Sequence, residues 1–194
     1  MAMTTEMHLR ETAESRYRFD YKGMHRYLIT LPSFKSQSVF TSREVVIKVL
    51  DLLREGTWQH HFDVYAYCFL PDRLVTIIRG KTEYSDMKAF LTSFRATSSL
   101  AFEAVLGHPL WKRTYLERVL RKQEDSDKIA AEVYALPVKE GLIAAGGEYP
   151  FRGSFVKSFE LGQARPRTPV KKKYPTAARR PGPNNKRPRP SRPR

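Results

Sequence analysis

The sequence predicts an α+β fold in which an antiparallel sheet is backed by helices. Two adjacent runs, residues 62–69 and 73–78, are rich in β-branched and aromatic residues, which indicates two strands. Pro71 and Asp72 separate them, and a proline cannot continue a central strand, so we expect a sharp corner there. Three further stretches have helical periodicity. The resulting order, strand, helix, strand, strand, helix, strand, helix, is typical of this fold class.

Alternation along the first of these strands gives two faces, and neither is polar. Aromatic side chains share one face and smaller ones share the other: Tyr65, Tyr67 and Phe69 against Val64, Ala66, Cys68 and Leu70. Because both faces are apolar, we expect cover on both sides of the strand pair, and we expect that cover to be helical. Cys68 is the single cysteine, so it forms no internal disulfide and is predicted to be a small buried side chain.

The chain before the strand pair contains a loose segment, a strand and a helix. Residues 1–15 have mixed charge and no periodicity, and we expect them to be poorly ordered. Residues 25–31 predict a first strand that ends at Pro32. Thr41 and Glu44 have the spacing of a capping box, which predicts a helix that starts there and ends near residue 56.

The chain after the strand pair begins with a long helix, predicted over residues 85–106. Its apolar side chains recur every three or four residues and define the expected buried face: Met87, Phe90, Leu91, Phe94, Ala101, Phe102 and Val105. Gly107 and Pro109 follow as stop signals. A short strand is expected over 116–120, then a third helix from about 125 to Pro137, and a last short element over 151–159.

Length and charge divide the chain into a folded part and a tail. The 194 residues allow one domain, predicted over 16–160, followed by an extension over 161–194. The formal net charge is +15, which indicates a polyanionic partner. The extension carries twelve positive and no negative side chains, so about +3 remains for the rest. Because it is also rich in proline, we expect a disordered tail that binds nucleic acid, with contacts from Lys171, Lys172, Lys173, Arg179 and Arg180.

No apolar run approaches the roughly 20 residues that span a bilayer. The first ten residues also lack the apolar stretch of a signal peptide. We therefore expect no membrane partner and a cytoplasmic, nucleoid-associated protein.

Four short motifs resemble those of one known family. They are Leu70-Pro71-Asp72-Arg73-Leu74-Val75, the segment from Leu110 to Arg121, Pro137-Val138-Lys139-Glu140-Gly141-Leu142-Ile143, and Tyr149-Pro150-Phe151-Arg152-Gly153-Ser154. In this order and spacing they are similar to motifs of the single-tyrosine HUH transposases, in the branch of REP-associated tyrosine transposases. The resemblance covers roughly residues 16–155, and it implies a ferredoxin-like core.

In active members of this family, two histidines on a strand and a third ligand hold Mg²⁺ or Mn²⁺ on the scissile phosphate, and a helix-borne tyrosine attacks it. The resemblance places Arg73 and Val75 at the histidine positions and Glu132 at the tyrosine position. Arginine has no lone pair for a metal, and valine has no polar atom. We therefore expect no metal ligands and no cofactor, with Mg²⁺ or Mn²⁺ needed only if a rearranged site cuts DNA.

Tyr134 is the candidate catalytic residue for such a rearranged site. It lies two residues beyond Glu132, about 200° around a helix, so we expect its side chain to point away from the attacking position. A register slip near Pro137 would bring it into place.

The phosphate-binding character of the family is retained. Arg73 puts a fixed cation where the metal would lie. The long helix adds two cations on one polar face, and the segment 111–121 adds a stackable ring with four cations, a combination suited to unpaired bases and backbone. The predicted DNA contacts of the folded part are Arg73, Lys88, Arg95, Trp111, Lys112, Arg113, Arg118 and Arg121.

Three functions are compatible with these features. The first is a transposase-like protein that binds single-stranded or hairpin DNA and does not cut it. The second is an active single-strand DNA transposase with a rearranged site. The third is an RNA-binding or nucleoid protein in which the basic tail dominates. A monomer and a homodimer are both compatible with the sequence.

Overall fold

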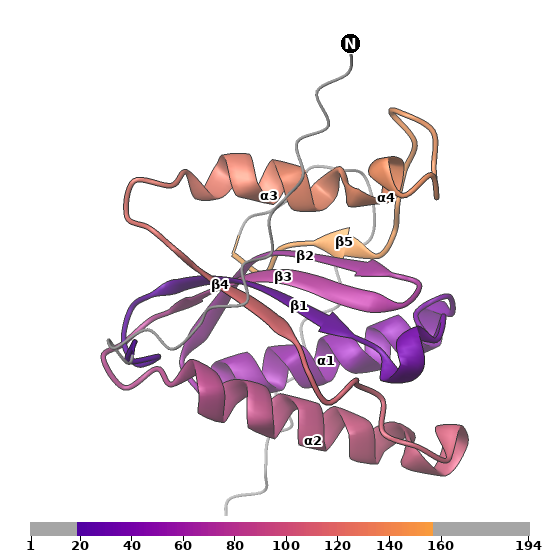
Figure 1. Ribbon diagram of the computed structural model, residues 1–194, viewed down its shortest axis with the longest axis horizontal. Helices are drawn as coiled ribbons and strands as arrows, with labels where there is room; N and C mark the ends of the chain where they lie inside the picture. The colour runs from indigo at the N-terminus through magenta and orange to yellow at the C-terminus, as the bar shows by residue number, and fades with distance from the viewer. Residues whose placement is uncertain (1–18, 157–194) are drawn as a thin grey trace, which may run out of the picture. The chain divides into compact units, whose positions relative to one another are not determined.

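The computed structural model describes residues 19–156, and Figure 1 shows the arrangement of their helices and strands. The elements are β1 (Arg26–Pro32), the 3-10 helix η1 (Phe34–Ser36), α1 (Arg43–Gln59), β2 (Phe62–Leu70), β3 (Arg73–Gly80), α2 (Met87–Leu106), β4 (Leu116–Leu120), α3 (Ser126–Tyr134), α4 (Leu136–Lys139) and β5 (Arg152–Gly153). This succession confirms the predicted order, with element ends shifted by a few residues. The predicted terminal segments 1–15 and 161–194, and the end of the predicted element 151–159, lie outside the described residues.

The five strands form one antiparallel sheet in the order β4-β1-β3-β2-β5. The first four, connected through α1 and α2, make the ferredoxin-like arrangement. The short strand β5 adds to the outer side of β2. At the opposite edge of the sheet, the outer side of β4 has no strand partner among residues 19–156.

Helices cover both faces of the sheet, as Figure 1 shows: α1 and α2 lie on one side, α3 and α4 on the other. The α1/α2 side holds a large core built around buried aromatic rings, Tyr27, Phe40, Phe69, Phe90 and Phe94. The α3 side holds a second, smaller cluster of aliphatic side chains. The prediction of helical cover on both faces is therefore confirmed. None of the helices within residues 19–156 combines the length and the apolar character needed to cross a bilayer.

A β-bulge in β2 changes the predicted faces of that strand. The pairing with β3 shifts between Val64 and Ala66. As a result, Val64 packs into the α1/α2 core, whereas Tyr65 lies with Ala66 on the α3 side. The predicted alternation is wrong for Val64 and Tyr65, because one inserted residue reverses the phase of a strand. Cys68 is fully buried as predicted, and burial raises its thiol pKa to about 12.

The long helix α2 ends as predicted, but its buried face differs from the prediction. Gly107 follows it with a φ of 67°, the left-handed conformation that ends many helices. Val105 is 81% exposed and Ala101 is also exposed, whereas Ser98 is fully buried. The Ser98 hydroxyl donates to the Phe94 carbonyl at 2.5 Å, and this bond allows a polar side chain to occupy the buried stripe.

The start of α1 also differs from the prediction. Its N-cap is Ser42, and no side-chain capping bond is formed. The capping box expected from Thr41 and Glu44 is therefore not present, because the helix begins one residue later than that motif requires.

Candidate nucleic-acid interface

The start of β3 carries Arg73 and Val75, the two residues that the sequence resemblance aligns with metal-binding histidines. Arg73 is paired with two carboxylates there: its Nη1 lies 2.7 Å from Asp72 Oδ1, and its Nη2 lies 2.5 Å from Glu140 Oε1. Val75 is 7% exposed and packs into the cluster under α3. The cation that was expected to attract phosphate is thus already compensated inside the protein.

The residues around these positions do not suit a divalent metal ion. Asp72 and Glu140 are the carboxylates that meet Arg73, and both already accept from its guanidinium. Within residues 19–156, no group of three or more His, Cys, Asp or Glu side chains is placed to hold a metal. A metal-dependent cleavage would need oxygen or nitrogen ligands that the described part of the chain does not bring together.

Tyr134 lies on the side of α3 that faces the sheet. Its side chain is 8% exposed, and its hydroxyl donates to the backbone carbonyl of Gly153 at 3.2 Å, with the carbonyl of Tyr65 at 3.4 Å. The buried stripe of α3 includes Tyr134, whereas Glu132 is exposed, so of the two it is Tyr134 that faces the sheet. The break between α3 and α4 falls at Ala135, close to the position of the predicted register slip.

The Tyr134 hydroxyl nevertheless lies beside a different part of β3 from Arg73, further along the strand. The carbonyl of Tyr65 belongs to the bulge beside Ala66, which pairs with Ile77. Ile77 lies four residue steps from Arg73 on β3, which corresponds to about 13 Å along the strand. Burial also raises the pKa of Tyr134 to about 12, so its hydroxyl stays protonated at neutral pH. The position of Tyr134 does not favour it as a nucleophile beside Arg73.

Two buried and two partly buried tyrosines give the protein a contribution to stability that is lost at high pH. Burial raises the pKa of Tyr27, Tyr67, Tyr134 and Tyr149, in the last two from 10 to about 12. The folded state therefore keeps protons that the unfolded state loses, so this contribution is complete below pH 10 and is lost as pH rises towards 12.

We expect the urea midpoint to fall over that range. Ultraviolet titration should show that some tyrosines ionise only as the protein unfolds. In Tyr134→Phe, the number of tyrosines that ionise on unfolding should be smaller by one. Reversible ionisation of every tyrosine near pH 10, in protein that stays folded, would contradict this expectation.

Two of the predicted DNA contacts on α2 and β4 are cations with carboxylate partners. Lys88 Nζ lies 2.5 Å from Glu117 Oε1 and donates to the hydroxyl of Tyr115 at 3.2 Å. Arg118 Nη1 lies 2.6 Å from Glu124 Oε1. Since each charge is already balanced, a phosphate would have to compete with a carboxylate for it.

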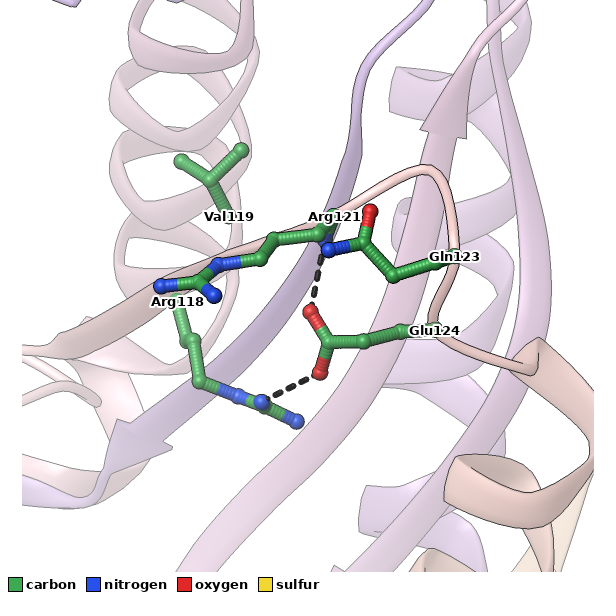
Figure 2. Close-up of a pocket in the computed structure, with 5 residues that line it drawn as sticks. All are labelled: Arg118, Val119, Arg121, Gln123 and Glu124. Atoms are coloured by element: carbon green, nitrogen blue, oxygen red, sulfur yellow. Dashed lines mark hydrogen bonds and ion pairs between the residues drawn. The ribbon is translucent and has the colours of Figure 1, made fainter.

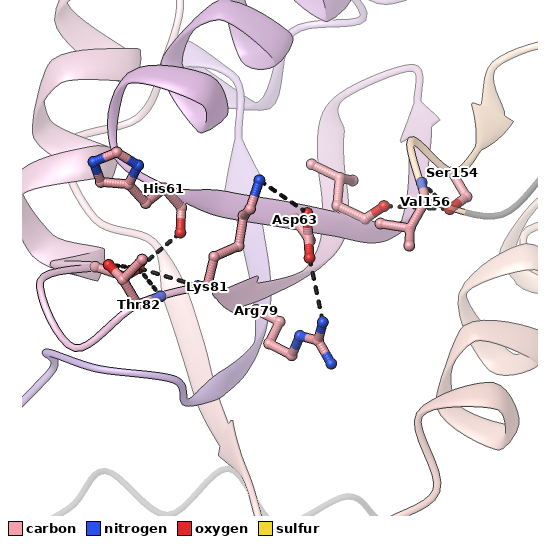
Figure 3. Close-up of polar contacts among 9 residues, drawn as sticks. His61, Asp63, Arg79, Lys81, Thr82, Ser154 and Val156 are labelled. Atoms are coloured by element: carbon pink, nitrogen blue, oxygen red, sulfur yellow. Dashed lines mark hydrogen bonds and ion pairs between the residues drawn. The ribbon is translucent and has the colours of Figure 1, made fainter.

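A further group of compensated cations lies where β2 begins and β3 ends. Figure 3 shows Asp63 between Arg79 and Lys81, at 3.3 Å and 3.9 Å from their nitrogens. The adjoining loop is held by the His61 carbonyl, which accepts from the backbone N–H of Lys81 at 2.9 Å. One carboxylate therefore balances only part of the charge of these two cations.

Trp111 belongs to the core and not to a surface that stacks on bases. It is 3% exposed, and its rings pack against Phe40 and Phe94. Its Nε1 donates to the buried hydroxyl of Ser98 at 2.7 Å. The prediction that Trp111 contacts DNA is corrected accordingly, because neither face of the ring is accessible to a base.

Arg95 holds the loop that leads into β4. Its Nη2 donates to the carbonyls of Lys112 and Arg113, at 2.7 Å and 2.9 Å, and its guanidinium lies over the ring of Tyr115. The side chains of Lys112 and Arg113 are exposed and form no ion pair with another residue in the range 19–156. Arg95 was predicted to contact DNA; in the structure its guanidinium binds the backbone of the two exposed cations, Lys112 and Arg113.

Arg26 holds the turn that follows β4 in the same way. Its Nη2 donates to the carbonyls of Arg121 and Lys122, at 2.5 Å and 3.2 Å, and its Nη1 donates to the carbonyl of Glu124 at 2.9 Å. Arg121 and Lys122 are exposed, and within the described chain neither forms an ion pair. The two ends of β4 thus resemble each other, because each presents two adjacent cations whose backbone carbonyls are bound by an internal arginine.

A hollow of about 480 Å³ lies beside this turn. Figure 2 shows its lining, with Glu124 reaching both the backbone of Arg121 and the guanidinium of Arg118. The Arg121 N–H, at 2.6 Å from Oε2, and the charge of Arg118 hold the pKa of the Glu124 carboxyl below its usual value. The carboxylate therefore closes the turn and pairs with Arg118, and the charge of Arg121, which forms no ion pair among residues 19–156, adds to the lowering of its pKa.

Comparison with known proteins supports the fold and does not supply a family. No family model and no curated protein matches the sequence. A solved REP-associated tyrosine transposase, bound to a REP hairpin, matches with a TM-score of 0.60 and 17% identity, over 72% of this chain and 82% of that one. The chain shares the fold of this transposase. A candidate transposase of Deinococcus radiodurans R1 also matches, with a TM-score of 0.44 and 16% identity, over 64% of this chain and 96% of that one.

Two residues of this transposase-like domain that bear on the interface were missed from sequence. Lys122 extends the cation run by one residue beyond Arg121, and adjacency alone would have identified it. Arg26 is separated from its partners by more than ninety residues, so no local pattern indicates its role.

Proposed function

We propose that this transposase-like chain binds single-stranded or hairpin DNA in the nucleoid and does not cut it by metal-dependent tyrosine chemistry. The observation that carries the proposal is the pair of exposed, unbalanced cations at each end of β4: Lys112, Arg113, Arg121 and Lys122. Cations without internal partners can neutralise phosphates and release counterions, which is the main source of affinity for nucleic acid.

The fold supports structured DNA as the partner. The hairpin-bound transposase has the same fold, although at 17% identity its contacts cannot be transferred residue by residue. The tail contributes differently, because its twelve cations without acidic neighbours favour binding that depends on salt and not on sequence. In this proposal the folded domain selects the shape of the DNA and the tail adds affinity.

Three features support binding without cleavage. Arg73 and Val75 replace side chains that would bind a metal, and the nearby carboxylates are engaged by Arg73 itself. The Tyr134 hydroxyl is tied to a backbone carbonyl in a site that keeps it protonated. DNA binding in this form needs no metal ion, so a chelator should leave the affinity unchanged.

The test is fluorescence anisotropy with the full chain and three probes of mixed sequence: a DNA hairpin with a single-stranded extension, a blunt duplex of equal length, and the matching RNA hairpin. We expect the DNA hairpin to bind most tightly, equally with Mg²⁺, Mn²⁺ or a chelator. On a denaturing gel, we expect no covalent protein–DNA adduct with either metal.

Each other function predicts a different result. An adduct that requires a metal and disappears in Tyr134→Phe would replace this proposal with an active transposase. Equal affinity for the RNA hairpin, or for the blunt duplex, would replace it with an RNA-binding or general nucleoid protein.

A further inference from the structure

The free edge of the sheet has an uneven distribution of charge. β4 is the edge strand, and its outer side has no partner among the described residues. Arg118 lies in the middle of this strand and is balanced by Glu124. Along this edge, exposed cations without an ion pair among residues 19–156 lie beyond the two strand ends: Lys112 and Arg113 before it, Arg121 and Lys122 after it.

We propose, on the basis of the function proposed above, that these two cation pairs bind the backbone of one double-helical stem at the same time. Eight residue steps separate Arg113 from Arg121, and an extended chain covers at most about 26 Å over that length. Double-stranded DNA rises about 3.4 Å per base pair, so a stem of about eight base pairs is long enough to reach from one pair to the other. The inferred ligand is a hairpin whose stem is of about this length or longer, so that both cation pairs can contact it together.

The arrangement suits a stiff partner because each pair is held in place before binding. Arg95 binds the backbone carbonyls of Lys112 and Arg113, and Arg26 binds those of Arg121 and Lys122. Restraining the backbone reduces the conformational entropy that is lost when a phosphate is bound. Two contacts on one rigid ligand also reinforce each other, since the first contact raises the local concentration of the second.

The cations at this sheet edge also have a simpler explanation, and the experiment must distinguish it from DNA binding. Charged side chains at a free sheet edge discourage pairing with other chains, and such cations need no ligand. That role would show as self-association after the charges are removed, and it would leave DNA affinity unaffected.

The experiment compares full-chain variants on two DNA hairpins whose stems are about four and about twelve base pairs long, below and above the span. One variant removes the first pair, Lys112→Ala with Arg113→Ala, and one removes the second pair, Arg121→Ala with Lys122→Ala. The matched control is Arg43→Ala with Lys48→Ala, which removes two exposed cations from α1 on the other side of the sheet. The basic tail is present in every variant, so its contribution cancels when the affinity of a variant is divided by that of the wild type on the same hairpin.

On the long stem we expect removal of either pair to weaken binding on the order of tenfold, and the control to change it less than about twofold. On the short stem we expect removal of either pair to weaken binding only about twofold, because the stem then occupies the pair that remains. Equal losses on both stems would overturn the simultaneous contact. No loss on either stem, while the wild-type chain still prefers hairpin DNA, would overturn this inference and leave the proposed function standing.

A double-mutant cycle tests the positioning role of Arg95. On the long stem, Arg95→Ala should weaken binding nearly as much as removal of Lys112 and Arg113, and should add little in a chain that already lacks them. A loss that adds fully in that background would assign Arg95 a direct contact instead. If Arg95→Ala does not fold, as judged by its thermal midpoint, the comparison of stem lengths still decides the proposal.

Discussion

Replacing Trp111 with alanine is expected to lower the free energy of unfolding by about 3 to 5 kcal/mol. The ring is 3% exposed, packs against Phe40 and Phe94, and bonds the buried hydroxyl of Ser98. The substitution therefore removes a large apolar group and also leaves a buried hydroxyl without its donor. Urea unfolding followed by circular dichroism measures the effect.

The second tryptophan of the chain supplies a matched control. Trp58 is 78% exposed on α1, so Trp58→Ala should change the free energy of unfolding by no more than about 0.5 kcal/mol. Trp111→Phe should lose less than Trp111→Ala, and when folded it should bind hairpin DNA as the wild type does. Normal stability with abolished DNA binding in Trp111→Ala would instead restore the ring as a surface for stacking bases.

Neutralising five cations of the tail is expected to weaken DNA binding on the order of a hundredfold near physiological salt. The substitutions are Lys171→Ser, Lys172→Ser, Lys173→Ser, Arg179→Ser and Arg180→Ser. Each phosphate contact contributes about 0.7 to 0.9 to the slope of log affinity against log salt, so the slope should fall by roughly 3.5 to 4.5. Anisotropy titrations over a series of salt concentrations measure both quantities.

The preference for hairpin over blunt duplex should survive this change, because contacts to phosphates in a tail carry no information on shape. A control that exchanges lysine for arginine and arginine for lysine at the same five positions keeps the charge and should keep the slope. If the preference for hairpins disappears together with the tail charges, the folded domain does not read the DNA, and a tail-dominated nucleoid protein is the better description.

Most of the fold could be predicted from the sequence because its signals are local. Pro71 and Asp72 mark the corner between β2 and β3, and Gly107 marks the end of α2, since each acts on the backbone at its own position. The prediction was wrong where a single residue changed the alternation of faces along a strand or the first residue of a helix. The bulge at Tyr65 reversed part of β2, and α1 began after Ser42 without the expected capping box.

The candidate site could be predicted only in part. Lys112, Arg113 and Arg121 were identified as exposed cations, and the structure leaves them without ion pairs in the part of the chain that it describes. Lys88 and Arg73 were identified by the same reasoning, yet carboxylates balance both of them. The sequence shows that a residue is charged, but it does not show which other side chain lies beside it.

The sequence by itself determined the class of the fold, the order of its elements and the excess of positive charge, since periodicity, turn residues and composition depend on neighbours along the chain. Only the tertiary structure decided which charges are available. Arg73 meets Glu140, Lys88 meets Glu117, and Arg26 binds the turn after β4, in each case across a separation that only folding closes. The physical reason is that electrostatic balance depends on distance in space, and the chain brings these partners within a few ångströms of each other when the sheet and its helices assemble.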